Sequence, residues 1–222
     1  LLKVRDWVIL EQIIQNCRYF GLNDFYIVVG YGRKYIEEWS GSYRTPKSHI
    51  KINLIYNKKF KLGNIFSFYQ ARSVFRRGAI LINSDLYFDR RILGNLIKSH
   101  QENVLVIDNH RQLDHEDMKV RVRGGKIVEI NKNVDLRQAH GEYIGILRFS
   151  GKIAPKLIES LNKKMTIDKN CYYEDGLQYF LEQGGNFGVL STKGLPWIEI
   201  DTPADLTRAN KMKNLWISNR KI

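Results

Sequence analysis

The chain has 222 residues, 43% of them apolar, and a formal net charge of +13. This is enough apolar sequence for one large domain with a real core, or for two small ones. No segment approaches the roughly 20 apolar residues of a membrane span, and no secretory signal pattern opens the sequence. The two cysteines, Cys17 and Cys171, have no neighbours at metal-ligand spacing, so we expect free thiols in a reducing cytoplasm.

The basic residues are scattered along the whole chain and do not form one patch with interleaved aromatic side chains. Scattered charge gives no continuous footprint for nucleic acid, which argues against that partner. It suits an enzyme that attracts small polyanions such as a nucleoside triphosphate. It equally suits a surface that is merely well solvated.

The first half of the chain alternates helical and strand-like patterns. Helical spacing predicts a helix over residues 7–20, which Gly21 ends. The patterns that follow predict strand 25–30, helix 34–39, strand 51–56, helix 65–75, strand 79–83, helix 91–99 and strand 104–108. This alternation predicts an α/β domain with a largely parallel sheet.

The pattern changes in the second half. Two predicted strands, residues 118–122 and 126–131, flank Gly124-Gly125, a pair typical of a hairpin turn. The remaining predicted elements are strand 143–149, helices 154–161 and 173–183, strands 187–191 and 197–200, and helix 203–212. Because we find no repeats and no low-complexity linker, one continuous domain over residues 1–222 is the simplest account.

An apolar run that ends in Asp85 is the most informative segment. Ile80 and its apolar neighbours Leu81 and Ile82 are typical of a strand buried on both faces of a sheet. Ligands of open α/β sheets bind at the carboxyl ends of the strands, so Asp85 is placed where a metal-bound phosphate would be handled. The alternative is an aspartate that only caps the following turn.

A second acidic segment lies near the other end of the chain. Glu199 and Asp201 are two residues apart and would share one face of a short strand. Asp201 or Thr202 is also placed to cap a helix that has Pro203 at its first position. Mg²⁺ prefers a few carboxylates and keeps its other positions for water and phosphate oxygens. Asp85 with Glu199 or Asp201 would satisfy it, although spacing alone does not show that the two segments meet.

Eight segments, in order along the chain, carry a family resemblance: residues 1–4, Gly63-Asn64-Ile65-Phe66-Ser67-Phe68, Asn83-Ser84-Asp85, Asp117-Met118-Lys119-Val120, Glu129-Ile130-Asn131-Lys132, Gly141-Glu142-Tyr143-Ile144-Gly145, Tyr173-Glu174-Asp175 and residues 197–203. Together they cover nearly the whole chain. They resemble the nucleotidyltransferase family that includes sugar-1-phosphate nucleotidylyltransferases. Within it, they are most similar to cytidylyltransferases acting on phospho-alcohols such as phosphocholine or inositol phosphate.

The resemblance implies one Rossmann-like domain of the nucleotide-diphospho-sugar transferase type, with a mostly parallel central sheet and a mixed second half. It implies that Asp85 and Asp201 hold Mg²⁺, with Glu199 as the alternative at the second position. It also implies transfer of a nucleotidyl group, CTP being the favoured donor, to a phosphorylated small-molecule acceptor. The acceptor phosphate would attack the α-phosphorus and release pyrophosphate, so catalysis would consist mostly of alignment and charge neutralisation.

The resemblance assigns further residues to the site. For the nucleotide these are Gly63, Asn64, Ser67 and Ser84; for the acceptor phosphate, Lys119 and Lys132; for the acceptor pocket, Glu142, Tyr143, Gly145, Tyr173 and Glu174. Both lysines could instead be ordinary solvated side chains, and the aromatic residues could belong to the core.

One part of the family pattern is absent. The family's first strand and its Gly-rich phosphate loop would lie just before Leu1. We therefore expect upstream residues in the natural protein to fill a central slot between strand 25–29 and strand 79–83. Direct pairing of those two strands would contradict this expectation, and a chain that really begins at Leu1 should have weak or no activity.

Two other function classes remain open. A glycosyltransferase that uses a nucleotide sugar would carry an Asp-x-Asp motif after the sheet strand, whereas the sequence has Asn83-Ser84-Asp85. A non-catalytic module would use the basic surface to hold nucleic acid or a partner. The oligomeric state is left open, with a homodimer as one option.

Overall fold

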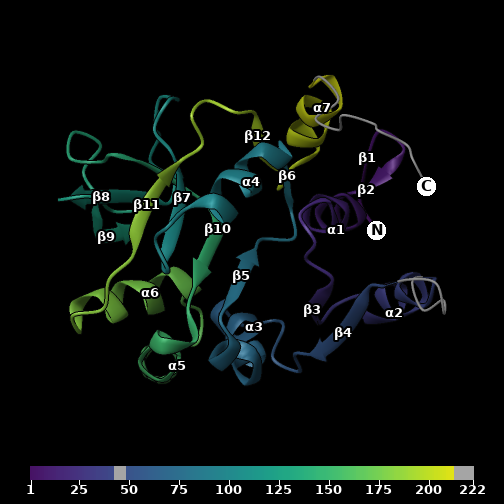
Figure 1. Ribbon diagram of the computed structural model, residues 1–222, viewed down its shortest axis with the longest axis horizontal. Helices are drawn as coiled ribbons and strands as arrows, with labels where there is room; N and C mark the ends of the chain where they lie inside the picture. Colours follow the sequence, from purple (N-terminus) through teal and green to yellow (C-terminus); the bar gives the residue numbers. More distant parts are fainter. Residues whose placement is uncertain (43–48, 213–222) are drawn as a thin grey trace.

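The computed structural model describes residues 1–42 and 49–212. Its main sheet has six strands in the order β5 (Ala79–Ile82), β10 (Gly141–Phe149), β7 (Val104–Asp108), β11 (Gly188–Ser191), β9 (Lys126–Asn131) and β8 (Lys119–Arg123). Strands β5 and β7 are both antiparallel to β10, and β11 is parallel to β7. Four strands of the sheet, β5, β7, β8 and β11, therefore share one direction, and β9 and β10 run against them. The expected α/β class is confirmed (Figure 1).

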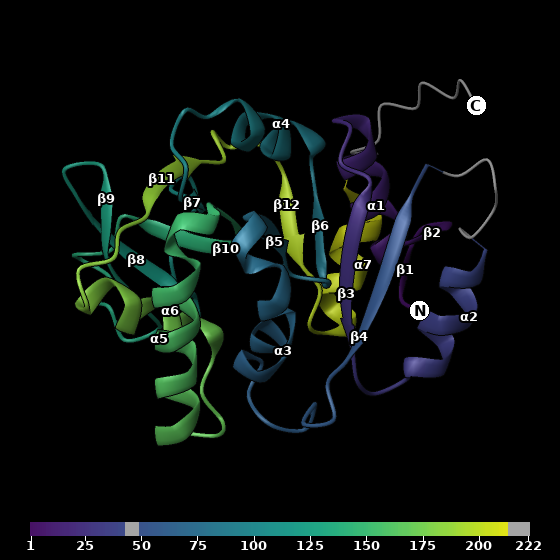
Figure 2. The same ribbon diagram turned by 60° about the horizontal axis from the view of Figure 1, so that its bottom comes forward.

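Helices cover both faces of this sheet. On one face lie α3 (Ile65–Gln70), the 3-10 helix Ala71–Arg77, α5 (Ala154–Ile167) and α6 (Tyr173–Glu182); on the other lie α1 (Ile9–Tyr19) and α4 (Arg90–Lys98). Each face of the sheet packs against its helices in a separate hydrophobic core. Neighbouring side chains of β10 alternate between these cores: Leu147 packs in the core with α3, α5 and α6, and Ile146 in the core with α1 and α4. Figure 2 shows α5 and α6 on the side opposite α4.

Strand β10 changes register in its middle. Its pairing with β7 shifts between Tyr143 and Leu147, and Gly145 lies there with φ of +77°. A Cβ atom at Gly145 would lie 2.5 Å from Nδ2 of Asn83, whose backbone N–H donates to the Gly145 oxygen at 2.9 Å. The glycine therefore lets the loop after β5 approach β10 closely.

Two strands form a short antiparallel ribbon outside the main sheet. Strand β6 (Leu86–Phe88) pairs with β12 (Trp197–Glu199), with Leu86 opposite Glu199. The prediction placed a strand over residues 197–200 but none over 86–88. Helix α7 (Pro203–Lys211) follows β12 directly.

The N-terminal helix begins later than predicted. Trp7 and Val8 form strand β2 and pair with β1 (Lys3–Val4), so the helix expected from residue 7 starts at Ile9. Arg5, with φ of +53°, makes the turn between these two strands. The helix predicted over 65–75 is α3 followed by the 3-10 segment, and α5 runs to Ile167 instead of ending at residue 161.

Strand β3 (Asp24–Val29) pairs in parallel with β4 (Lys51–Tyr56), and helix α2 (Arg33–Gly41) connects them. Within the described ranges, neither β3 nor β4 pairs with the main sheet. The direct pairing of β3 with β5, which would have contradicted the expected slot, is therefore not seen. Each described helix is too short or too polar to cross a lipid bilayer.

The role of Gly145 can be tested by adding one methyl group. We expect Gly145→Ala to lower the free energy of unfolding by about 2–4 kcal/mol, because it combines left-handed strain with a clash. Gly124→Ala is the matched control: Gly124 also has positive φ, +56°, but no atom lies within 4 Å of its added Cβ. Gly124→Ala should lower the free energy of unfolding by only about 1 kcal/mol. Equal losses in urea denaturation would contradict the close approach at Gly145.

Candidate active site

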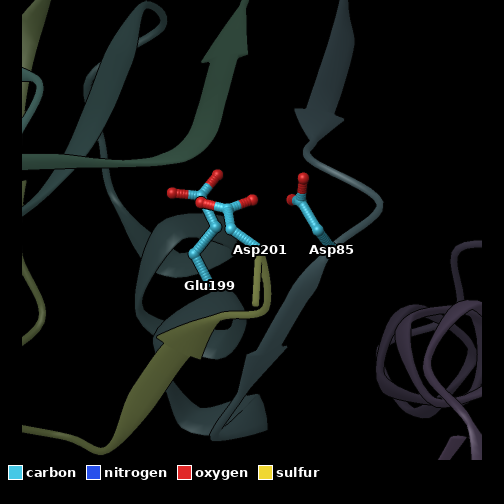
Figure 3. A group of neighbouring side chains, drawn as sticks. All are labelled: Asp85, Glu199 and Asp201. Carbon is cyan, nitrogen blue, oxygen red and sulfur yellow. The ribbon is translucent and has the colours of Figure 1, made fainter. Parts of the chain in front are cut away.

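The ribbon of β6 and β12 brings the two acidic segments together. Asp85 immediately precedes β6, Glu199 ends β12, and Asp201 follows two residues later. The Ile200 N–H donates to the Asp85 backbone oxygen at 3.1 Å, which extends the ribbon by one contact. One carboxylate oxygen from each of the three acids lies within 4.8 Å of the others (Figure 3). Segments more than a hundred residues apart thus meet at one point.

Two of the three carboxyl groups have raised pKa values. Burial, followed by the charges of Asp85 and Asp201, raises the pKa of Glu199 to about 7. Burial also raises the pKa of Asp85, and the charge of Asp201 adds to it. The buried Oδ1 of Asp85 has no hydrogen-bond partner. An all-oxygen set of ligands with one unpartnered oxygen fits a hard divalent cation such as Mg²⁺.

The N-terminal cap of α7 does not use the Asp201 side chain, which belongs to the acidic cluster. Thr202 is the N-cap, and its side chain forms a capping box with Asp205. Of the two predicted capping residues, the structure selects Thr202. Asp201 contributes a backbone N–H to Asp205, at a long 3.3 Å.

A cavity of about 1360 Å³ contains the acidic cluster and most of the other predicted site residues. Those that line it are Asn64, Ser67, Ser84, Lys132, Glu142, Tyr143, Gly145, Tyr173 and Glu174. Gly63 and Lys119 are not among its lining residues. A Cβ atom at Gly63 would lie 2.0 Å from the Cys171 carbonyl oxygen, so Gly63 serves close packing of two loops.

Lys119 has a different environment from the one expected of a phosphate ligand. Its side chain is buried, and its Nζ donates to the backbone oxygens of residues 114, 115 and 117 at 3.1, 2.9 and 3.2 Å. These three carbonyl groups use the donors of the ammonium group. The structure therefore corrects the expected contact with an acceptor phosphate: Lys119 holds the loop before β8.

Two buried tyrosines connect the predicted acceptor pocket to the acids. Tyr173 Oη lies 3.1 Å from Oδ1 of Asn83 and 3.0 Å from Oη of Tyr143. The Asn83 side chain in turn lies near Glu199 and lowers the pKa of its carboxyl group, against the larger effect of burial. The Tyr173 backbone N–H donates to Oδ1 of Asn64 at 2.8 Å, so Asn64 positions α6. Burial raises the pKa of both tyrosines well above the usual value, which keeps them neutral donors.

Two further glutamates on the cavity wall are shielded from water. Burial raises the pKa of Glu174 to about 8, and its Oε2 has no hydrogen-bond partner. Burial also raises the pKa of Glu142 to about 8, although the charge of Arg111, with which it forms an ion pair, opposes the shift. This part of the cavity is therefore buried and poorly solvated, and it favours the neutral form of both glutamates near pH 7.

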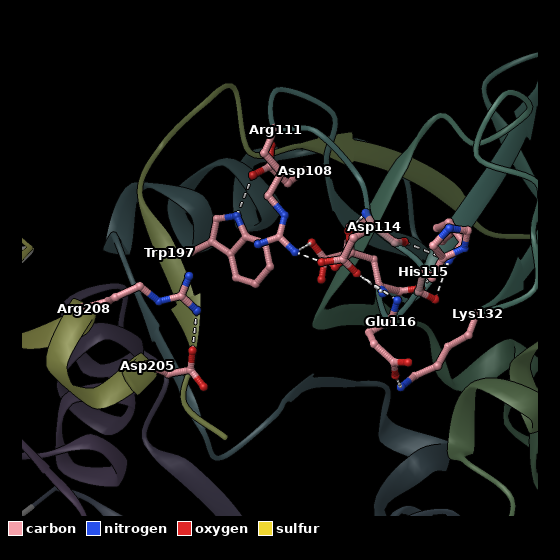
Figure 4. Close-up of polar contacts among 12 residues, drawn as sticks. Asp108, Arg111, Asp114, His115, Glu116, Lys132, Trp197, Asp205 and Arg208 are labelled. Carbon is pink, nitrogen blue, oxygen red and sulfur yellow. Dashed lines mark hydrogen bonds and ion pairs between the residues drawn. The ribbon is translucent and has the colours of Figure 1, made fainter. Parts of the chain in front are cut away.

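Arg111 is a site residue that the sequence reasoning missed. Its guanidinium bridges Glu142 and Asp117, at 2.8 Å from Asp117 Oδ1, and lies 4.9 Å from the centre of the Trp197 ring (Figure 4). The Trp197 indole N–H donates to Asp108 at 2.8 Å. The sequence offered one indication of its role: Arg111 lies shortly after the carboxyl end of predicted strand 104–108, where ligands of α/β sheets bind.

Lys132 reaches the cavity from the turn after β9. Its Nζ lies 3.2 Å from Oε2 of Glu116 and 5.5 Å from the centre of the Tyr172 ring (Figure 4). Burial lowers the pKa of Lys132, but the hydrogen bond to Glu116 and nearby negative charges, including Glu199, raise it overall. Lys132 therefore presents a positive charge to the cavity.

Comparison with known proteins finds one curated relative. No family model matches the chain. It is 23% identical over 222 residues to the bifunctional IPC transferase and DIPP synthase of Rubrobacter xylanophilus, covering 99% of this chain and 48% of that protein. The chain therefore spans about half the length of this curated relative.

Two solved structures share the fold. The inositol-1-phosphate CTP transferase of T. maritima has a TM-score of 0.73 at 21% identity, covering 91% of this chain and 83% of that one. The CTP:phosphocholine cytidylyltransferase of Streptococcus pneumoniae has a TM-score of 0.69 at 17% identity, covering 95% and 87%. The Rossmann-like fold of these transferases and the resemblance drawn from the sequence are confirmed.

The buried acids predict a pH dependence of stability. Glu142 and Glu174 have pKa values of about 8 in the folded protein and Glu199 of about 7, against 4.5 for an unperturbed glutamate. The folded state thus binds more protons than the unfolded state in this range. The stability contribution is complete below an unfolded pKa of about 4.5 and is lost as pH rises through the folded values.

We therefore expect the melting temperature in EDTA to fall between about pH 5 and pH 8. A loss of about 1 kcal/mol corresponds to roughly 2–4 °C for a chain of this size. Glu174→Gln should make the fall shallower, because one titrating group is removed. Glu159→Gln changes an exposed glutamate on α5 and should leave the slope unchanged. A wild-type melting temperature that is flat or rises over this range would contradict the buried, protonated acids.

Proposed function

We propose that residues 1–222 form a nucleotidyltransferase domain that transfers CMP from CTP to a phosphorylated alcohol. The observation that carries this proposal is the meeting of Asp85, Glu199 and Asp201 at the edge of a Rossmann-like fold. In a cavity rich in carboxylates, a triphosphate needs a cation to lie beside these acids. Mg²⁺ held by the three carboxylates would neutralise phosphate charge and help position the phosphate under attack.

The choice of donor and acceptor follows the named relatives. The T. maritima and Streptococcus pneumoniae proteins are both named as users of CTP, with inositol 1-phosphate and phosphocholine as acceptors. In the proposed reaction, an oxygen of the acceptor phosphate forms a bond to the α-phosphorus of CTP. The bond from that phosphorus to the bridging oxygen breaks, and pyrophosphate leaves. No covalent intermediate with the protein is required.

The residues of this chain supply alignment and charge. Lys132 and Arg111 bring positive charge to a cavity that is otherwise lined by acids, so each can attract an anionic acceptor phosphate. Tyr143 and Tyr173 are neutral and hydrogen-bonded to one another, which fixes the position of the wall beside Asn83. Asn83 in turn lies near Glu199 and favours its charged form. This chain of contacts couples the acceptor pocket to the acidic cluster.

The unpartnered oxygen of Glu174 can accept a hydrogen bond from an alcohol hydroxyl of the acceptor. Because this side chain is buried, a hydroxyl that satisfies it would be recognised strongly over a group that leaves it unpaired. Glu174 is therefore proposed to bind the alcohol part of the acceptor.

Asp85→Asn tests the metal role directly. We expect the rate of pyrophosphate release from CTP and the acceptor to fall by about 100-fold or more, because a charged ligand is lost. The same variant should unfold at a slightly higher temperature in EDTA, since repulsion within the cluster is relieved. Glu38→Gln, at an exposed position of α2, is the control and should retain normal turnover. Normal turnover in Asp85→Asn would contradict the proposal.

Lys132→Met separates an acceptor contact from general folding effects. Its KM for the phosphorylated acceptor should rise by about ten-fold, because a charge-assisted contact to phosphate is lost, while its KM for CTP changes little. Lys126→Met, at an exposed position of the preceding strand β9, should leave both values unchanged. Should the two KM values rise together, or neither rise, the placement of the acceptor phosphate beside Lys132 is wrong.

A further inference from the structure

Four aromatic side chains line the cavity near the predicted acceptor pocket: Tyr143, Tyr172, Tyr173 and Trp197. Open ring faces are what proteins use to bind a quaternary ammonium group, such as the one in phosphocholine. A wall of hydrogen-bonding groups would instead suit an alcohol with several hydroxyl groups. The surroundings of each ring therefore bear on the chemical class of the acceptor.

Two of the four rings are packed in the core. Tyr143 and Tyr173 are both buried, and their rings meet edge to face with centres 6.3 Å apart. Phe68 packs against the Tyr173 ring at 5.5 Å. The two hydroxyl groups lie 3.0 Å apart, and that of Tyr173 also contacts Asn83 on the cavity wall. These residues thus bring hydroxyl groups to the wall, and their ring faces serve the core.

A cationic side chain lies over each of the other two rings. The Arg111 guanidinium is 4.9 Å from the centre of the Trp197 ring, and Nζ of Lys132 is 5.5 Å from the centre of the Tyr172 ring. Both distances are in the range of a cation–π interaction. Figure 4 shows Arg111 beside the Trp197 ring. An ammonium group of a ligand would have to displace these cations or share a ring with a like charge, and either costs binding free energy.

Ion pairs hold both cations in place. Arg111 bridges the buried acids Asp117 and Glu142, and Lys132 pairs with Glu116 at 3.2 Å. Moving Arg111 away would leave two buried acids without this partner, so its displacement is costly. The Lys132 pair is more exposed to solvent and therefore weaker. The acids beside the two rings are thus already paired with cations of the protein itself.

The wall also carries a group that a hydroxyl would satisfy. Glu174 is 5% exposed, and within the described residues its buried Oε2 has no hydrogen-bond partner. Burial raises the pKa of this side chain to about 8, so near pH 7 it offers hydrogen bonds and little negative charge. A neutral carboxyl group donates and accepts hydrogen bonds, as a hydroxyl group does. A quaternary ammonium group has no N–H to donate and cannot satisfy this oxygen.

We propose that Arg111 and Lys132 determine the class of acceptor: they exclude a quaternary ammonium group, and the cavity takes the monophosphate of an alcohol with several hydroxyl groups, one of which binds Glu174. The same two positive charges attract the phosphate of such an acceptor and repel an ammonium group attached to it. The inference rests on the proposed function for the location of the acceptor and adds its chemical class.

Calorimetric titration with three monophosphates tests this class without turnover. The ligands are myo-inositol 1-phosphate, phosphocholine, and 3,3-dimethylbutyl phosphate, which has the shape of phosphocholine with carbon in place of the charged nitrogen. We expect phosphocholine to bind about five-fold or more weakly than its uncharged isostere, because the two cations repel only the charged group. It should bind about ten-fold or more weakly than inositol 1-phosphate, which satisfies Glu174.

An aromatic cage would reverse the first comparison. Phosphocholine that binds as tightly as its isostere, or as tightly as inositol 1-phosphate, would overturn the inference while leaving an acceptor site in place. Failure of all three ligands to bind would contradict the acceptor site of the proposed function, and this inference with it.

Uncovering a ring tests the role of the two cations. In Arg111→Met, the affinity for phosphocholine relative to its isostere should rise by about five-fold or more, because the Trp197 ring is freed. Lys132→Met, whose ion pair is exposed, should shift the same ratio in the same direction even if Arg111→Met folds poorly. Arg123→Met, at an exposed position of β8, is the control and should leave the ratio unchanged. An unchanged ratio in Lys132→Met and Arg111→Met would overturn the assignment of both residues.

Glu174→Leu tests the hydroxyl contact. Its affinity for inositol 1-phosphate relative to 3,3-dimethylbutyl phosphate should fall by about ten-fold or more, because one ligand loses a buried hydrogen bond and the other has no hydroxyl to lose it. Glu159→Leu, at an exposed position of α5, should leave this ratio unchanged. A purely structural role for Glu174 would weaken both ligands equally, and that result would contradict the contact.

Discussion

The short ribbon of β6 and β12 is the constraint on which the site depends. It pairs Leu86 with Glu199, and the Ile200 N–H extends it by donating to the Asp85 oxygen. These few contacts hold three carboxylates together although two of them stand far from the third in the sequence. The ribbon in turn is anchored by Leu86 and its buried neighbours in the core that also contains α1 and α4. Core packing therefore stabilises an arrangement that charge repulsion alone would disperse.

The same arrangement lowers the free energy of unfolding of the protein without a bound cation. Asp85 and Glu199 have raised pKa values, and an oxygen of Asp85 has no partner. Buried carboxylates without a counter-ion cost free energy, which a bound cation would recover. A site that is unfavourable when empty is thus suited to bind a cation together with an anionic substrate. The buried Glu174 extends this property into the part of the cavity that we propose binds the acceptor.

Much of the fold could be predicted because its signals are local. The alternation of apolar runs and helical spacing predicted strand 51–56 correctly. Asp85 and Glu199 were selected because each lies at or just after the carboxyl end of a predicted strand, and the structure brings them together. The ribbon strand over 86–88 was missed because three apolar residues give no period, and its partner lies more than a hundred residues away. The role of Lys119 was missed because a lysine that bonds backbone carbonyls and a lysine that binds phosphate have the same sequence signal. Arg111 lies in a loop, where spacing carries little information.

The central claim is that Asp85, Glu199 and Asp201 together hold a divalent cation. A crystal structure with Mn²⁺ and CTP, analysed for anomalous scattering from manganese, tests it most directly. The account predicts a peak within coordination distance of all three carboxylates and of a phosphate oxygen of CTP. CTP bound in the cavity with no manganese peak between these acids, or with the peak on other residues, would contradict it.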